Sequence, residues 1–187
     1  MKRRFTAKRI ALLALLCAGA LCVFVVENLF PAFLVPGARL GLGNVFTMLS
    51  LVLLGNAEGI ILVVVKSVLG SLIIGNTGAL IYSLSAGLVS VLIGIALLGI
   101  KKEVFTLTAI SVLCAIVHNF VQTLVFCLVT GQTYALSFMP YLALIGAFGG
   151  ILVGVSTTLI IKKTPASVFE KITAERNKED KFGTEKR

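Results

Sequence analysis

Long apolar stretches constrain this chain more than any other feature. The clearest are Ile10–Val26, Ile60–Val65 and Leu88–Leu98. A helix needs a predominantly apolar run of about 20 residues to cross a bilayer, whereas strands of a membrane barrel alternate polar and apolar residues. Hydrophobic residues make up 58% of the 187-residue chain and charged residues 13%. This composition excludes a soluble globule and a disordered chain, and it predicts an all-α integral membrane protein.

Breaks at glycine, proline and charged residues divide the chain into six candidate spans. They cover residues 9–27, 41–54, 58–75, 79–99, 106–129 and 138–161. Basic residues gather at both ends of the chain, and the pair Lys101 and Lys102 falls in a connector on the same side. Because basic flanks favour the cytoplasmic side, we expect a multi-pass protein of the cell membrane with both termini inside. The transmembrane domain then covers residues 9–161, and its two cytoplasmic ends are residues 1–8 and 162–187. The net charge of +9 reflects this topology rather than nucleic-acid binding.

Two segments allow alternative interpretations. Ala18-Gly19-Ala20 follows a basic start and an apolar core, as in a signal peptide, but the apolar run continues and later segments are also apolar, so we expect a retained first helix. The connector Asn28–Gly43 contains two prolines and is nevertheless apolar. Such a connector is predicted to be buried, either as a lid over an outward-facing pocket or as a structural plug. The second and third spans are short, which marks either a binding site or a thin, tilted bundle.

Polar side chains inside the spans are the candidate substrate site. Lys66 lies near the middle of the third span, where a charge costs about 2.5–3.5 kcal/mol on insertion scales and should face the interior. The candidate set comprises Lys66, His118, Asn119, Gln122, Arg39, Asn44 and Glu27. We expect Glu27 to pair with Arg39 and hold the first connector over the cavity. The structural alternative pairs Lys66 with Glu27 or a carbonyl, and places His118 in hydrogen bonds between helices.

Small residues at four-residue spacing form two stripes. Gly146, Gly150 and Gly154 occupy the last span, and the first helix carries Ala7, Ala11, Ala14 and Ala18. Such stripes let helix backbones approach closely. We expect helix packing for the glycines, and for the alanines either packing or docking to a partner subunit.

Catalytic groups are scarce in this sequence. The only aspartate is Asp180, in the tail, and the only histidine is His118. Metal-dependent transferases need several carboxylates, zinc sites need at least three ligands, and no phosphate-binding loop motif occurs. The four cysteines lie within apolar runs without CxxC spacing. We therefore expect no enzyme activity, no cofactor and no metal site.

Several motifs together resemble one membrane family over about residues 8–161. They are Glu27–Pro31, Pro36–Asn44, Leu54–Gly55, Lys66–Ser71, Tyr82–Gly87 and His118–Gln122. This combination resembles the Gx transporter family, which is also labelled heptaprenyl diphosphate synthase component I. Where many relatives are expected to carry arginine this chain has Lys66, which keeps the charge but loses the bidentate fork.

More distantly, the chain resembles the substrate-binding S components of energy-coupling-factor transporters. That resemblance implies six helices, a first loop that caps the substrate, and an AxxxA face on the first helix that docks to a coupling subunit; either alanine pair fits. It also implies separate ATPase subunits. The expected substrate is a small anionic or polar molecule. The alternative function is a non-catalytic membrane assembly subunit associated with prenyl diphosphate synthesis.

Overall fold

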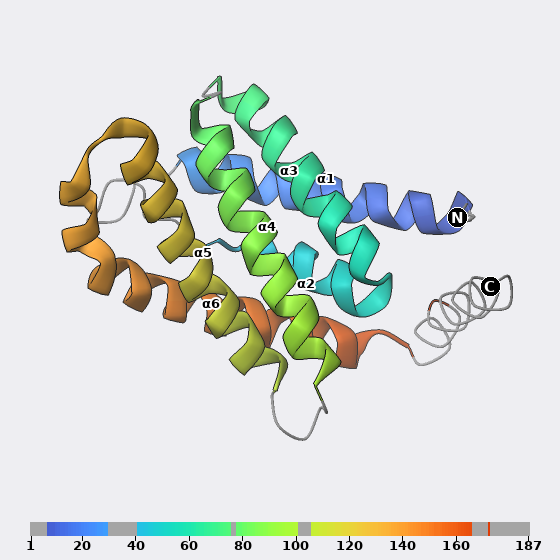
Figure 1. The fold of residues 1–187 in the computed structure, drawn as a ribbon. Coiled ribbons are helices and arrows are strands. Elements are labelled where there is room, and N and C mark those ends of the chain that lie inside the picture. Colours follow the sequence, from blue (N-terminus) through green and yellow to red (C-terminus); the bar gives the residue numbers. More distant parts are fainter. Residues whose placement is uncertain (1–6, 30–40, 76–77, 101–105, 166–171, 173–187) are drawn as a thin grey trace, which may run out of the picture.

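The computed structural model describes residues 7–29, 41–75, 78–100, 106–165 and 172, and these residues are helical with no strand among them (Figure 1). The helices are α1 (Ala7–Leu29), α2 (Asn44–Leu53), α3 (Asn56–Ile74), α4 (Gly78–Gly99), α5 (Leu107–Thr130), the 3-10 helix η1 (Thr133–Phe138) and α6 (Met139–Lys163). The all-α prediction is confirmed, and the five long helices begin and end within a few residues of the predicted spans.

Within the described residues, five helices are long and apolar enough to cross a membrane, which makes this a multi-pass membrane protein. The exception is α2, with ten residues. At about 1.5 Å per residue it extends about half of the roughly 30 Å hydrocarbon core. The predicted span at 41–54 is therefore a short helix, and the six-span count and its orientation stay predictions.

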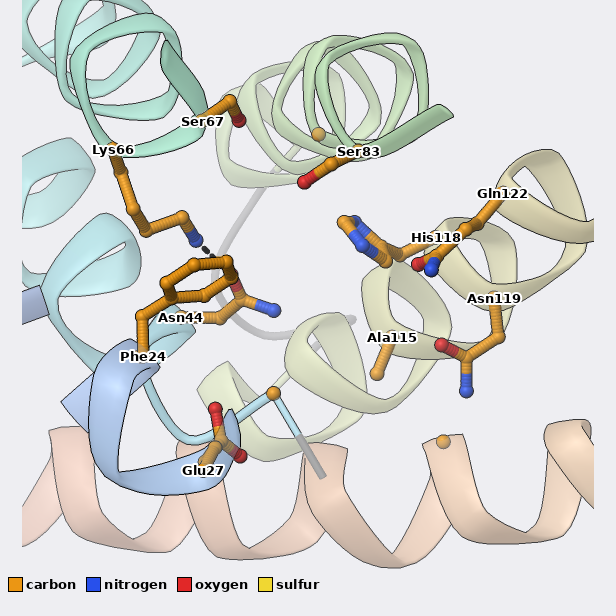
Figure 2. A pocket seen from close by; sticks show the side chains of 14 residues that line it. Phe24, Glu27, Asn44, Lys66, Ser67, Ser83, Ala115, His118, Asn119 and Gln122 are labelled. Atoms are coloured by element: carbon orange, nitrogen blue, oxygen red, sulfur yellow. Dashed lines mark hydrogen bonds between the residues drawn. The ribbon is translucent and has the colours of Figure 1, made fainter. Parts of the chain in front are cut away.

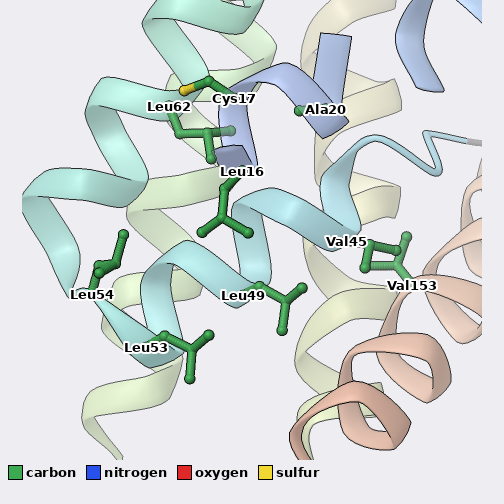
Figure 3. Close-up of a cluster of buried hydrophobic side chains, with 9 residues drawn as sticks. All are labelled: Leu16, Cys17, Ala20, Val45, Leu49, Leu53, Leu54, Leu62 and Val153. Carbon is green, nitrogen blue, oxygen red and sulfur yellow. The ribbon is translucent and has the colours of Figure 1, made fainter. Parts of the chain in front are cut away.

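Most of α2 is buried inside the bundle, against α1, α3 and α6. Its apolar face contributes Val45, Leu49 and Leu53 to a core that also includes Leu16 of α1 and Leu62 of α3 (Figure 3). The helix ends at Leu53, and the chain then reverses at Gly55, whose φ of 125° is a conformation that residues other than glycine rarely adopt. This reversal lets α3 run back beside α2.

Successive helices run antiparallel. The end of α1 lies beside the segment that enters α2, as shown by the hydrogen bond that the Leu42 amide donates to Glu27 Oε1 over 2.9 Å. Along the α5–α6 contact, Gly146 lies beside Ala115, whereas Gly154 lies beside Thr108, so these two helices also run in opposite directions. The bundle therefore places the start of α1, the α2–α3 turn and the end of α6 at one end (Figure 1).

The glycine stripe of α6 lies against the backbone of α5. A Cβ on Gly150 would be 2.6 Å from Val112 Cα, and one on Gly154 would be 2.4 Å from Thr108 Cα. Real Cβ atoms do not approach so closely, so the α5–α6 spacing depends on these glycines.

The alanine stripe of α1 faces away from the bundle. Ala7, Ala11, Ala14 and Ala18 are all exposed. The opposite face of the same helix is buried through Arg9, Leu16, Cys17 and Ala20. A partner helix could therefore approach the alanines without disturbing the core.

Candidate functional site

Six of the seven predicted substrate-binding residues line one cavity of about 50 Å³ (Figure 2). They are Glu27, Asn44, Lys66, His118, Asn119 and Gln122. The seventh, Arg39, lies outside the described residues, as do most of the predicted lid and the proposed Glu27–Arg39 pair. The fold thus brings together polar groups from α1, α2, α3 and α5 that are far apart in the sequence.

Lys66 and Asn44 form the polar centre of the cavity. Lys66 Nζ donates to Asn44 Oδ1 over 2.6 Å, which joins α3 to the first residue of α2. The chain turns into α2 at Gly41, whose φ is 70°. A side chain at Gly41 would be strained, and its Cβ would lie 3.0 Å from Asn44 Nδ2. Gly41 therefore leaves room for the amide that holds Lys66.

Glu27 lies at the end of α1 and holds the segment that enters α2. Its Oε1 accepts the hydrogen bond from the Leu42 amide. A hydrogen bond from a backbone amide to a carboxylate is stronger than one between neutral groups. Glu27 thus fixes the backbone next to Asn44, while its carboxylate also faces the cavity.

The three predicted site residues of α5 do not share one role. Asn119 Nδ2 donates to the Leu142 carbonyl of α6 over 2.9 Å, beside Gly146. Asn119 therefore pairs helices as well as lining the cavity. His118 and Gln122, one helical turn apart, lie on the cavity side of α5 (Figure 2).

Eight further lining residues were not among the predicted substrate-binding residues, and three of them have side chains larger than a methyl group. These three are Phe24, Ser67 and Ser83. Phe24 packs where Gly70 leaves space, since a Cβ on Gly70 would be 2.5 Å from the Phe24 ring. Nothing in an apolar run distinguishes such a phenylalanine from a lipid-facing one. Ser83 falls in the Tyr82–Gly87 motif, which was the available signal for it.

The polar groups of the cavity suit the recognition of a small ligand. It combines one ammonium, one carboxylate held by a backbone amide, an imidazole and carboxamides. Over the described ranges, no group of three His, Cys, Asp or Glu side chains could hold a metal ion. Hydrogen-bonding groups within otherwise apolar helices fix a ligand's orientation and give specificity.

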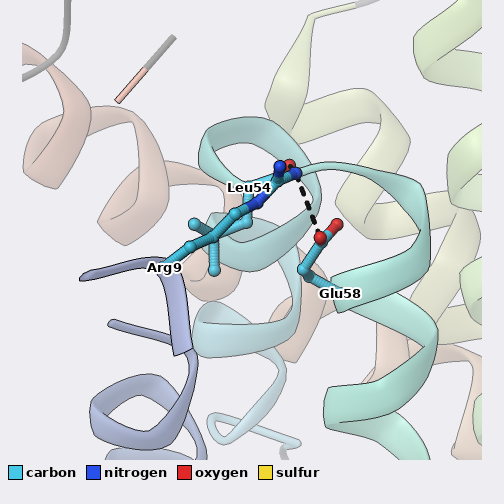
Figure 4. Close-up of polar contacts among 3 residues, drawn as sticks. All are labelled: Arg9, Leu54 and Glu58. Atoms are coloured by element: carbon cyan, nitrogen blue, oxygen red, sulfur yellow. Dashed lines mark hydrogen bonds and ion pairs between the residues drawn. The ribbon is translucent and has the colours of Figure 1, made fainter. Parts of the chain in front are cut away.

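A second polar cluster lies at the other end of the same helices. Arg9 Nη2 and Glu58 Oε1 are 3.0 Å apart, and the guanidinium also donates to the Leu54 carbonyl (Figure 4). Arg9 adjoins the basic N-terminal end of the chain and Glu58 begins the third predicted span, so their positions in the sequence suggest exposed side chains. Both side chains are instead buried. A pairing between residues so distant in the chain carries no local sequence signal.

A family model described as heptaprenyl diphosphate synthase component I matches residues 16–160, and this confirms the resemblance found in the sequence. The description designates one component of a synthase and indicates no catalytic role for it. Neither a curated protein nor a solved structure matches the chain.

Proposed function

The chain belongs to the heptaprenyl diphosphate synthase component I family, and on that premise we propose that it is the substrate-binding subunit of a membrane uptake system. Its substrate is a small anionic or polar molecule. The observation that carries the proposal is the cavity around Lys66 and Asn44, because a cation within membrane helices is costly unless it serves a pathway or a ligand. His118 and Gln122 supply directional hydrogen bonds to the same ligand.

In this proposal the bundle crosses the cell membrane with six spans and both termini inside. Labelling of single cysteines near each end of the chain tests the orientation. Reagents that do not cross the membrane should fail to reach residues 1–8 and 162–187 in intact cells. Reaction at either end contradicts the topology.

Active uptake requires partner subunits, namely a coupling membrane subunit and ATPase subunits. We assign the docking face to the exposed alanines of α1. Small side chains let a partner helix approach the α1 backbone closely, where lipid gives no hydrophobic drive for association.

Co-purification from native membranes tests the proposal. The tagged wild type should recover a coupling subunit with its ATPase, and Ala14→Leu combined with Ala18→Leu should lose both without unfolding. Ala96→Leu is the control, because Ala96 is also an exposed alanine, on α4. Recovery of no transporter subunit by the wild type contradicts the uptake function.

A second candidate function is favoured by the family description itself. It is a non-catalytic membrane assembly subunit associated with prenyl diphosphate synthesis. The same co-purification separates the two functions, since a prenyl synthase subunit as the main partner of the wild type would favour this one.

A further inference from the structure

A second cavity adjoins the one around Lys66. Its volume is about 40 Å³. It shares five lining residues with the Lys66 cavity, from α2, α4, α5 and the segment before α2, namely Gly41, Asn44, Gly87, Ala115 and His118. We call the second one the Ser111 cavity. The shared wall makes the two cavities neighbours, with His118 at their boundary.

The Ser111 cavity differs in chemistry from its neighbour. Apolar side chains line most of it, including Met48, Leu51 and Val91. Among the residues that the structure describes, no lysine, arginine, aspartate or glutamate lines it. Its polar groups are mainly hydroxyls, from Thr47 of α2, Ser90 of α4 and Ser111 of α5.

Two of these hydroxyls are buried without a hydrogen-bond partner in the part of the chain that the structure describes. Thr47 is 8% exposed and Ser111 is 3% exposed. Ser90 Oγ, by contrast, donates to the Cys114 carbonyl over 2.9 Å. Helix hydroxyls commonly bond to a carbonyl of their own helix, as Thr123 does here with Asn119.

A buried hydroxyl without a partner loses its hydration without compensation. Thr47 and Ser111 line the same cavity, so a ligand that places a hydrogen-bonding group there would find two hydroxyl partners. Either hydroxyl can donate to that group or accept from it.

The dimensions limit what can enter. The Lys66 cavity has about 50 Å³ and the Ser111 cavity about 40 Å³. Each water-sized group needs about 10–15 Å³, so each cavity takes on the order of three or four non-hydrogen atoms without helix displacement. This favours a ligand much smaller than a nucleotide or a long prenyl chain.

We propose that the substrate is a short amphiphilic anion that occupies both cavities. Its oxyanion head lies at Lys66 and Asn44, and its short alkyl part passes His118 and ends in a hydrogen-bonding group beside Thr47 and Ser111. This inference rests on the proposed function, since it names the substrate class of the same site.

The test uses three carboxylates as probes on the full-length chain purified in detergent, with binding measured by calorimetry. Acetate is small enough for the Lys66 cavity alone. Pentanoate and γ-hydroxybutanoate have equal numbers of non-hydrogen atoms and differ at the far end, which is a methyl group in one and a hydroxyl in the other. The wild type should bind γ-hydroxybutanoate about tenfold more tightly than pentanoate.

Removing the two hydroxyls by Thr47→Val with Ser111→Ala should abolish that preference. The control is Ser50→Ala with Thr157→Val, which removes two other buried hydroxyls without a partner among the described residues. Ser50 and Thr157 line neither cavity, so this control should keep the preference. Both double variants should melt no lower than the wild type, because none of the four hydroxyls has a hydrogen bond to another described residue.

The outcomes separate the two proposals. Lys66-dependent acetate binding without a hydroxyl preference would mean that the Ser111 cavity holds only water, which overturns this inference and leaves the proposed function standing. Binding of all three probes that is unchanged by Lys66→Met would overturn the proposed site itself. Failure of all three to bind at millimolar concentration would overturn the inferred substrate class, with co-purification then deciding the function.

Discussion

Two polar clusters join the same three helices, and they are built in opposite ways. At one end Arg9 and Glu58 form an ion pair with side chains 4% and 0% exposed. At the other, Lys66 donates to Asn44 beside a cavity, and Glu27 accepts a backbone hydrogen bond. The first cluster pairs charge with opposite charge, whereas the directly bonded partner of Lys66 is a neutral amide.

This difference separates structure from recognition. The charge of a guanidinium that is already paired with a carboxylate is compensated, so it attracts an incoming anion only weakly. An ammonium whose directly bonded partner is a neutral amide can also bind an anion, and the adjacent cavity, which the Glu27 carboxylate also lines, gives that ligand space. The ion pair should therefore govern stability, and the lysine should govern binding.

The largest expected effect comes from Glu58→Gln. Breaking a buried ion pair leaves an uncompensated charge and costs about 3–5 kcal/mol. We expect a loss of that size in the free energy of unfolding, measured by denaturant titration in mixed micelles. Ligand binding by the fraction that stays folded should not change.

The control replaces both partners, Arg9→Met with Glu58→Leu. Apolar side chains of similar size leave no buried charge, so this double variant should recover most of the lost stability. If the Glu58→Gln variant were as stable as the wild type, the ion pair would not govern stability, and the contrast drawn between the two clusters would be wrong.

The sequence was informative where the signal is local. Run lengths and breaks at glycine located five long helices to within a few residues, and intramembrane polarity selected Lys66 and His118, which line one cavity. These features follow from the free energy of placing each residue type in a membrane, which is a property of the sequence itself.

The rest depends on tertiary contacts. The length of α2 is limited by the reversal at Gly55 and by its burial within the bundle, and neither is encoded in its apolar run. Arg9 looked like another basic residue of a cytoplasmic flank, and only folding brings Glu58 to it. Likewise, Thr47 and Ser111 are ordinary helix residues until their helices meet around a cavity.

A smaller effect is expected at the α5–α6 contact, which forms one wall of the cavity. Gly150→Ala places a methyl group where Val112 Cα would lie 2.6 Å away. Overpacking of this kind costs about 1–3 kcal/mol and should lower the melting temperature. Gly99→Ala is the control, because no other described segment comes within 4 Å of its Cβ, and it should melt like the wild type. Equal melting of the two variants would show that α6 can move away without cost.

Glu27→Gln probes the binding cluster with a milder change. Glutamine still accepts the Leu42 amide hydrogen bond, but the bond is no longer charge-assisted, so we expect a loss of about 1 kcal/mol in stability. Amide hydrogen exchange at Leu42 should become faster. An unchanged exchange rate would mean that this bond does not hold the chain where it enters α2.

The smallest expected effect on stability is that of Lys66→Met, which keeps approximate size and removes the charge. The variant loses one hydrogen bond to Asn44 but also avoids the desolvation of an ammonium, so the two contributions oppose each other and stability should change by less than about 1 kcal/mol. Binding of acetate should fall at least about tenfold, because a charge-assisted contact is lost.

If Lys66 instead serves as a structural partner of Glu27, Lys66→Met should destabilise the protein, and adding Glu27→Gln should restore part of the loss. Such a rescue with ligand binding intact would show that Lys66, like Arg9, stabilises the fold and does not bind the ligand.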